Sequence, residues 1–185
     1  MRTLFGDGTW DWPEGRWLRV NFVASVDGSA QGSDGRSGTI NNEADKQVFH
    51  ALRRSADVIL VGAGTARAEE YKPSKTPIVV VGHTLPVLLQ DADNVRLASG
   101  PLPQIIEGVH AEGHRRILCE GGPTLLAGLL EADLVDELCL TTTPQLVGGP
   151  GKRLVDGAPL DVPLTLSSLV EADGTLLARW LVSRA

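Results

Sequence analysis

The chain has 185 residues, of which 42% are hydrophobic and 22% are charged, a composition that predicts one folded domain over residues 1–185 with a loose lead over 1–15. The net charge of −6 argues against nucleic acid as a partner, because phosphate backbones are bound by basic surfaces. Residues 1–8 offer no apolar stretch for a signal peptide and no run is long enough to span a bilayer, so we expect a cytoplasmic protein that does not bind a membrane.

The first half of the chain alternates short apolar strands with helices. Residues 17–26 predict a strand that Asp27-Gly28 ends, and 29–38 form a polar loop. Asn41 or Asn42 can cap the next helix, whose predicted buried stripe is Ala44, Val48, Ala51 and Leu52. Residues 57–61 and 77–81 are continuous apolar runs, typical of parallel strands covered on both faces, with a short helix over about 65–70 between them. The segment 87–97 is ambiguous.

The second half predicts two further helix-strand pairs and a hairpin. A helix begins near Pro101 and ends at Gly113, a strand covers 116–119, a helix begins at Pro123, and a strand covers 134–142. Residues 164–170 and 176–182 predict an antiparallel pair joined at Asp173-Gly174. Helices that alternate with buried strands predict an α/β fold with a mostly parallel central sheet and an antiparallel C-terminal strand pair.

Three strand-to-helix junctions are candidates for a dinucleotide site: Gly62-Ala63-Gly64-Thr65, Gly82-His83-Thr84 and Glu120-Gly121-Gly122-Pro123-Thr124. Ligands of parallel sheets bind where strands end, because helix N-termini there offer unpaired N–H groups. The first junction lacks the third glycine of a dinucleotide fingerprint, so an ordinary tight turn is an equal alternative. In the third, the glycines let backbone N–H groups approach a pyrophosphate, and an exposed Glu in a glycine turn is the alternative.

Three charged side chains are candidates for chemistry. Glu120 ends a strand, where a carboxylate can reach a ligand. Asp27 also ends a buried strand, so we expect its pKa to be raised and its carboxyl to donate or orient a proton, although Asp-Gly is an ordinary turn pair too. Arg53 can point to the ligand edge of the sheet or can be a surface charge.

Other chemistries lack their residue patterns. The sequence has no Gly-x-Ser-x-Gly hydrolase elbow and no phosphate-binding P-loop. Cys119 and Cys139 lie in apolar runs and indicate reduced packing residues, while His110 and His114 lack a third ligand. We therefore predict no metal site.

Six sequence blocks, in this order, carry a resemblance to a known family. They are Asn21-Phe22-Val23-Ala24-Ser25-Val26-Asp27-Gly28, Phe49-His50-Ala51-Leu52-Arg53, residues 57–70 around Val61-Gly62-Ala63-Gly64-Thr65, Cys119-Glu120-Gly121-Gly122-Pro123-Thr124-Leu125-Leu126, Leu134-Val135-Asp136-Glu137-Leu138 and Leu146-Val147-Gly148-Gly149. From about residue 17 to 154 the chain resembles the reductase domain of riboflavin biosynthesis, which is related to dihydrofolate reductase.

The resemblance implies a dihydrofolate-reductase-like three-layer fold, a homodimer, and NADPH-dependent reduction of the ribosyl group of 5-amino-6-(5-phosphoribosylamino)uracil to ribityl. It implies substrate contacts at Ser37, Arg53 and Glu120, catalytic roles for Asp27 and Glu120, and a place for Asp27 near the nicotinamide. The cofactor contacts that it implies are Thr65, Glu69, Gly122, Pro123, Thr124 and Leu125. The three junctions add Gly62, Gly64, Gly82, His83 and Gly121 as expected cofactor contacts, and we also expect one at Val23.

The chain departs from the family pattern at several places. The family usually has Asp where Glu69 stands. Gly82-His83 stand where the family commonly has Ser or Ser-Arg, so NADH stays open beside NADPH. Residues 71–99 look short, and the second substrate arginine has no counterpart, for which Lys72 and Lys75 are the candidate replacements. Two other functions also stay open: a reductase of the same fold for another pterin or pyrimidine, and a non-catalytic dinucleotide-binding protein.

Overall fold

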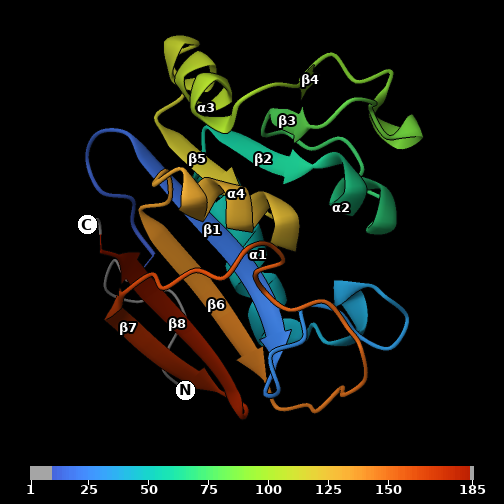
Figure 1. Cartoon of the computed structure of the whole chain (residues 1–185), viewed down its shortest axis with the longest axis vertical. Helices are drawn as coiled ribbons and strands as arrows, with labels where there is room; N and C mark the ends of the chain where they lie inside the picture. The colour runs from blue at the N-terminus through green and yellow to red at the C-terminus, as the bar shows by residue number, and fades with distance from the viewer. Residues whose placement is uncertain (1–9, 184–185) are drawn as a thin grey trace.

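The computed structural model describes residues 10–183, which are built around one eight-stranded sheet (Figure 1). Its strands are β1 (Trp17–Ser25), β2 (Val58–Gly62), β3 (Ile78–Val81), β4 (Val95–Ala98), β5 (Arg116–Cys119), β6 (Glu137–Thr143), β7 (Leu164–Ala172) and β8 (Thr175–Val182), in the order β4-β3-β2-β5-β1-β6-β8-β7. Strands β1 to β6 pair in parallel, and β8 pairs antiparallel with β6 and β7. The predicted sheet and its antiparallel C-terminal pair are confirmed.

Helices cover both faces of the sheet. They are α1 (Glu43–Ser55), α2 (Ala63–Ala68), α3 (Leu102–Ala111) and α4 (Pro123–Glu131), with short 3-10 turns η1 (Ser37–Thr39) and η2 (Val87–Leu89). Successive side chains of a strand point to opposite faces. In β2, Val58 and Leu60 pack in the cluster that includes α3 and α4, whereas Ile59 and Val61 pack with α2. Figure 1 shows α4 in front of β1 and α1 behind it, which is the predicted three-layer arrangement.

The segment left open over 87–97 contains an extra edge strand. η2 comes first, and β4 then pairs in parallel with β3, with Val95 opposite Ile78. None of the four β4 residues is fully buried. An edge strand of this kind has no clear apolar periodicity, which is why the sequence does not resolve it.

The α1 helix has one face that the sequence pattern does not predict. Asn42 is its N-cap, because the Asn42 side chain accepts a hydrogen bond from the backbone N–H of Asp45. Val48 and Leu52 are buried as predicted, but Ala44 and Ala51 of the predicted stripe are only half-buried. Asp45 is buried instead, which turns a polar face of the helix inward.

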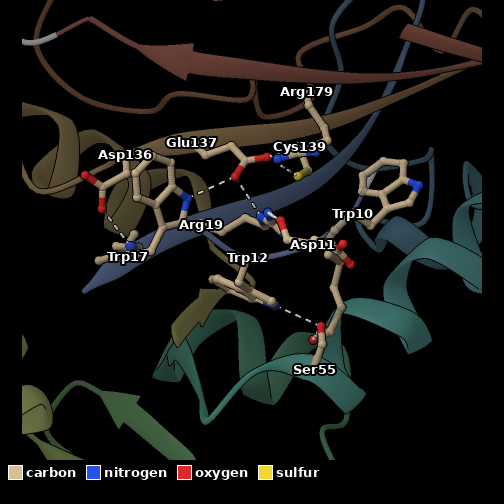
Figure 2. Close-up of polar contacts among 12 residues, drawn as sticks. Trp10, Asp11, Trp12, Trp17, Arg19, Ser55, Asp136, Glu137, Cys139 and Arg179 are labelled. Atoms are coloured by element: carbon tan, nitrogen blue, oxygen red, sulfur yellow. Dashed lines mark hydrogen bonds and ion pairs between the residues drawn. The ribbon is translucent and has the colours of Figure 1, made fainter. Parts of the chain in front are cut away.

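A buried charge cluster joins the starts of β1 and β6 to β8 (Figure 2). The Arg19 and Glu137 side chains are both fully buried, and Arg19 Nε donates to Glu137 Oε2 over 2.9 Å. Trp17 Nε1 donates to the same oxygen, and Arg179 Nε donates to Glu137 Oε1. Every donor around Glu137 therefore stabilises its charge in a place that water does not reach.

The same arginine holds the N-terminal segment. Arg19 Nη1 and Nη2 donate to the carbonyl oxygens of Trp10 and Asp11 over 3.0 and 2.9 Å, and Trp12 Nε1 donates to Ser55 of α1 over 2.8 Å (Figure 2). The prediction of a loose lead is therefore wrong for residues 10–12, because a buried guanidinium needs acceptors and finds them there. Residues 1–9 of the predicted lead lie outside the described residues.

Glu137→Gln should destabilise the protein by about 3 kcal/mol, because it leaves the buried Arg19 charge without its counter-ion. The pKa of Glu137 is lowered: burial opposes ionisation, but the hydrogen bond from Arg179 and the charges of Arg19 and Arg179 outweigh it. Urea unfolding measures the effect. Glu112→Gln, which removes an exposed pair with Arg96, is the control and should change stability little. Equal stability of the two variants would contradict the proposed role of the cluster.

Candidate functional site

The first and third glycine junctions touch each other. Gly62 N donates to Gly121 O over 2.7 Å, across the ends of the neighbouring parallel strands β2 and β5. A Cβ at Gly62 would lie 3.4 Å from Gly122 N, and a Cβ at Gly122 would lie 2.2 Å from Thr65 Oγ1. The Gly121-Gly122 peptide bond is cis. Two segments about sixty residues apart therefore form one surface, and this surface has no room for a side chain at Gly122.

A cavity of about 600 Å³ opens beside this contact, a volume within the range of small-molecule sites. Its walls come from β1, the loop before α1, α1 itself, α2 with the segment that follows it, and the β5–α4 junction. Nine residues predicted for cofactor or substrate contacts line it: Val23, Ser37, Arg53, Gly64, Thr65, Glu69, Glu120, Gly122 and Pro123. The structure thus brings together most of the positions that the six sequence blocks contributed.

The other predicted positions lie outside the cavity lining: Asp27, Gly62, Gly82, His83, Gly121, Thr124 and Leu125. Gly62 and Gly121 form the contact between the two junctions. Gly82 follows β3 and lies beside the start of α2, where a Cβ would come 2.6 Å from the Cβ of Ala63. His83 and Thr124 are exposed. The roles of these residues in binding stay predictions.

Glu120 is held by two neighbours on the cavity wall. Arg53 Nε and Nη2 each donate to one of its carboxylate oxygens over 2.6 Å, and the Tyr71 hydroxyl donates to Oε2 over 2.8 Å. The Arg53 guanidinium also lies 4.2 Å from the centre of the Phe49 ring. Of the two alternatives for Arg53, the structure supports the ligand edge. Such a bidentate pair fixes both side chains in direction as well as position.

The protonation of the Glu120 neighbours follows from their surroundings. Burial disfavours the charge of Arg53, but the hydrogen bond and the charge of Glu120 outweigh it and raise the pKa of Arg53. Burial and the Glu120 charge raise the pKa of Tyr71 well above its ordinary value. Arg53 is therefore a cation and Tyr71 a neutral hydrogen-bond donor near neutral pH.

Asp27 has a different environment from the one expected. It is exposed, and its carboxylate accepts hydrogen bonds from Ser25 Oγ over 2.5 Å, Val147 N over 3.2 Å and Gly148 N over 2.7 Å. These donors, Ser25 first, lower the pKa of Asp27 to about 2. The expectation of a raised pKa is therefore wrong, because the donors stabilise the charged form. The contacts fasten the segment after β6 to the end of β1, and a catalytic role for Asp27 stays a prediction.

Glu69 and Ser37, predicted for different ligands, are joined to each other. Glu69 Oε1 accepts from Ser37 N over 2.8 Å, which ties the loop before α1 to the end of α2. Of the two lysines considered for the missing arginine, Lys72 lines the cavity and Lys75 does not. Lys152, from the loop between β6 and β7, lines it as well.

No three His, Cys, Asp or Glu side chains within residues 10–183 are grouped so that they could hold a metal ion. None of the helices in this range has the length and apolar character needed to cross a membrane. Cys119 and Cys139 are free, buried thiols, and burial raises the pKa of both. Their predicted role as packing residues is confirmed.

Comparison with known proteins shows to which family this chain belongs. The family model of the RibD C-terminal domain matches residues 16–177. The chain belongs to this family. It is 30% identical to the 2,5-diamino-6-ribosylamino-4(3H)-pyrimidinone 5′-phosphate reductase of Methanothermobacter thermautotrophicus, over 78% of this chain and 86% of that one. It is also 30% identical to the riboflavin biosynthesis protein RibD of Mycobacterium tuberculosis, but over 70% of this chain and only 42% of that longer protein.

Solved structures show the same fold. A pyrimidine reductase-like protein from Corynebacterium diphtheriae matches this RibD C-terminal domain with a TM-score of 0.79 and 25% identity, over 92% of this chain and 93% of that one. A dihydrofolate reductase from Enterococcus faecalis matches with a TM-score of 0.65 and 12% identity, over 91% and 97% of the two chains. The expected dihydrofolate-reductase-like fold is confirmed.

Several residues that line the cavity of this RibD C-terminal domain are missed by the sequence reasoning: Asn21, Asn41, Asp45, Phe49, Tyr71 and Lys152. Four of the lining residues, Asn41, Asp45, Phe49 and Arg53, are spaced four apart. This spacing is a signal that could have been found, because it places side chains on one helix face. The apolar stripe alone does not reveal it. For Lys152, which lies in a loop, the sequence offers no such signal.

Gly122→Ala should weaken the junction contact and lower the melting temperature, because the new Cβ would lie 2.2 Å from Thr65 Oγ1. Adding Thr65→Ala removes that oxygen and should restore much of the loss. Gly64→Ala is the matched control, since a Cβ there meets nothing within 4 Å. Thermal unfolding of the four proteins measures this, and a Gly122→Ala loss that Thr65→Ala leaves untouched would contradict the packing.

Proposed function

We propose that this chain is a reductase of riboflavin biosynthesis that uses NADPH to reduce the ribosyl group of a ribosylaminopyrimidine 5′-phosphate to a ribityl group. The name of the Methanothermobacter relative and the family support this proposal. The observation that carries it is the hydrogen bond between Gly62 and Gly121, beside the cavity that Arg53 and Glu120 line. This bond brings together the starts of α2 and α4, and we call the surface that they form, from Gly62 to Thr65 and from Gly121 to Leu125, the cradle.

The cradle fits a nicotinamide dinucleotide. No side chain caps the start of α4, so its first N–H groups are available to an anion. Gly122 brings this helix start against Thr65 without a side chain between them. We assign the pyrophosphate to these N–H groups and the rest of the cofactor to the predicted contacts, with Val23 and Thr65 on the cavity wall. When bound, the reduced nicotinamide supplies a hydride.

The substrate chemistry needs positioning and one proton. The sugar ring opens when the C1′–O4′ bond breaks and the glycosidic nitrogen forms a double bond to C1′; hydride then adds to C1′ and O4′ takes a proton. A carboxylate has about four lone-pair sites, and Arg53 and Tyr71 fill three on Glu120. The fourth can accept a sugar hydroxyl and fix the sugar for attack. Asp27, with a pKa of about 2, is ionised at neutral pH, so we assign it an orienting role.

Purified protein should oxidise NADPH when a ribosylaminopyrimidine 5′-phosphate is added, with NADH as the alternative cofactor in the same assay. Glu120→Gln should lower kcat/KM about 100-fold, because the change leaves the Arg53 charge unbalanced on the cavity wall. Absorbance of the reduced nicotinamide measures both. Glu112→Gln, on the exposed surface, is the carboxylate control and should match the wild type.

The same assay separates the alternatives. Oxidation only with another pterin or pyrimidine would replace the proposed substrate and keep the fold and the cofactor. Tight NADPH binding without oxidation across the panel would favour a non-catalytic dinucleotide-binding protein. Unchanged kinetics of Glu120→Gln would remove that residue from the site.

A cytoplasmic location and a homodimer remain predictions, and the structure bears on the homodimer. Leu164, Leu166 and Leu169 of β7 are 41%, 46% and 54% exposed. Leu166 and Leu169 lie opposite Trp180 and Ala178 of β8, so they continue the apolar row of that strand onto the edge strand of the sheet. Exposed apolar side chains that lie side by side can form an interaction surface. We propose that it is the dimer interface.

Sedimentation analysis should show a dimer for the wild type, and Leu169→Lys should shift it to monomer, because a charge would be buried at the interface. Leu88→Lys, at an exposed leucine of η2, is the control and should leave the dimer intact. A monomeric wild type would contradict the proposed interface.

A further inference from the structure

One face of α1 presents a row of side chains to the cavity. Asp45, Phe49 and Arg53 follow each other at four-residue intervals, and Asn41 continues the row just before the helix. At 1.5 Å per residue the three helical members span about 12 Å. Arg53, at one end, is paired with Glu120. The proposed function uses that end and leaves the other, around Asp45, without a role.

The end around Asp45 carries oxygens without partners. Four buried side-chain polar atoms in residues 10–183 have no hydrogen-bond partner, and three of them, Asn21 Oδ1, Asn41 Oδ1 and Asp45 Oδ1, belong to residues that line this cavity. Asn21 is only 7% exposed and Asp45 only 2%. An unpaired buried polar atom costs about 1–3 kcal/mol. Three such atoms in the lining of one cavity indicate a site for a ligand that donates hydrogen bonds.

Asp45 differs from Glu120 in its neighbours. No ion pair joins Asp45 to a Lys, Arg or His of the described residues, whereas Arg53 balances the charge of Glu120. Burial raises the pKa of Asp45, and a hydrogen bond from the Thr141 side chain opposes this shift. Asp45 Oδ1 has no hydrogen-bond partner, so this oxygen can accept a hydrogen bond from a ligand.

The polarity of the cavity orients the substrate. An ionised phosphate group donates no hydrogen bond, so the unpartnered oxygens of Asn21, Asn41 and Asp45 do not provide a site for it. Lys72 lines the cavity next to Tyr71, at the Arg53 end of the row. Lys72 would then take the phosphate, and the ring would lie toward Asp45.

Two substrate rings differ at the edge that would meet Asp45. A 2-aminopyrimidin-4-one offers two adjacent donors, the 2-amino group and N3–H, which match the two oxygens of a carboxylate. A uracil offers N3–H between two carbonyl oxygens, so one carbonyl would face the carboxylate. We propose that Asp45, with Asn21 and Asn41, binds the donor edge of the ring and selects the 2-amino-4-pyrimidinone substrate over its uracil counterpart. This inference rests on the proposed function.

Kinetics with the two ring types test the selection. The wild type should use 2,5-diamino-6-ribosylamino-4(3H)-pyrimidinone 5′-phosphate with a kcat/KM at least about 100-fold above that for 5-amino-6-(5-phosphoribosylamino)uracil, because a site built around substrate donors discriminates strongly against an analogue that lacks one. Asp45→Asn replaces one acceptor by a donor and matches the uracil edge. In this variant the kcat/KM for the diamino compound divided by the kcat/KM for the uracil compound should fall at least about 100-fold.

Two measurements separate a change in selection from a loss of fold. The Kd of Asp45→Asn for NADPH should stay at the wild-type value, since the cofactor cradle lies at the glycine junctions. Glu43→Gln, an exposed carboxylate on the same helix, should keep the wild-type ratio. A ratio near one in the wild type, or one that Asp45→Asn leaves unchanged, would overturn the inference and point to the amino groups that both rings share.

Failure of the proposed function gives a different result. If neither compound is reduced, the reductase proposal falls, and the Kd values of the two compounds then decide on the ring site. Tighter binding of the diamino compound, reversed by Asp45→Asn, would support the site. Equal Kd values for the two rings would overturn it.

Discussion

The hydrogen bond from Gly62 N to Gly121 O is the constraint on which the site depends. It joins the ends of two parallel strands that are neighbours in the sheet, and each strand leads directly into a helix. The approach is possible because Gly62 and Gly122 lack side chains where a Cβ would meet the opposite junction. The start of α4 therefore lies against the start of α2, beside the cavity.

The α1 helix supplies another wall of the cavity, and the two ends of this wall differ in charge. Arg53 at its C-terminal end neutralises Glu120 beside the glycine junctions, while Asp45 at its N-terminal end forms no ion pair within residues 10–183. Phe49 lies between them, with the Arg53 guanidinium over its ring. A cavity with a cation-balanced end and an acceptor-rich end suits an elongated substrate that has an anionic group and a donor-rich ring.

The elements that position the site could be predicted because their local patterns are strong. The continuous apolar runs of β2 and β3 and the glycines after β2 and β5 predict buried strands that lead into turns. The fold supplies what local patterns lack. Glu120 and Arg53 were separate candidates, and only the structure shows that they pair, because 67 residues separate them in the chain.

The wrong expectations have the same origin. The pKa of Asp27 depends on Val147 and Gly148, which are distant in sequence. The sequence pattern does not reveal Asp45, because an apolar periodicity gives no signal for a buried carboxylate. The anchoring of residues 10–12 depends on Arg19, which is buried next to Glu137. The sequence does not reveal this burial, because an arginine near the start of a strand is expected to be exposed.

A crystal structure of the protein with bound NADPH tests the central claim most directly. The account predicts one cofactor per chain, with its pyrophosphate at the N–H groups that begin α4, between Thr65 and Gly122, and its nicotinamide beside Val23 and Glu120. Density for the cofactor away from the two glycine junctions, or a chain that takes up no cofactor when both coenzymes are supplied in excess, would contradict it.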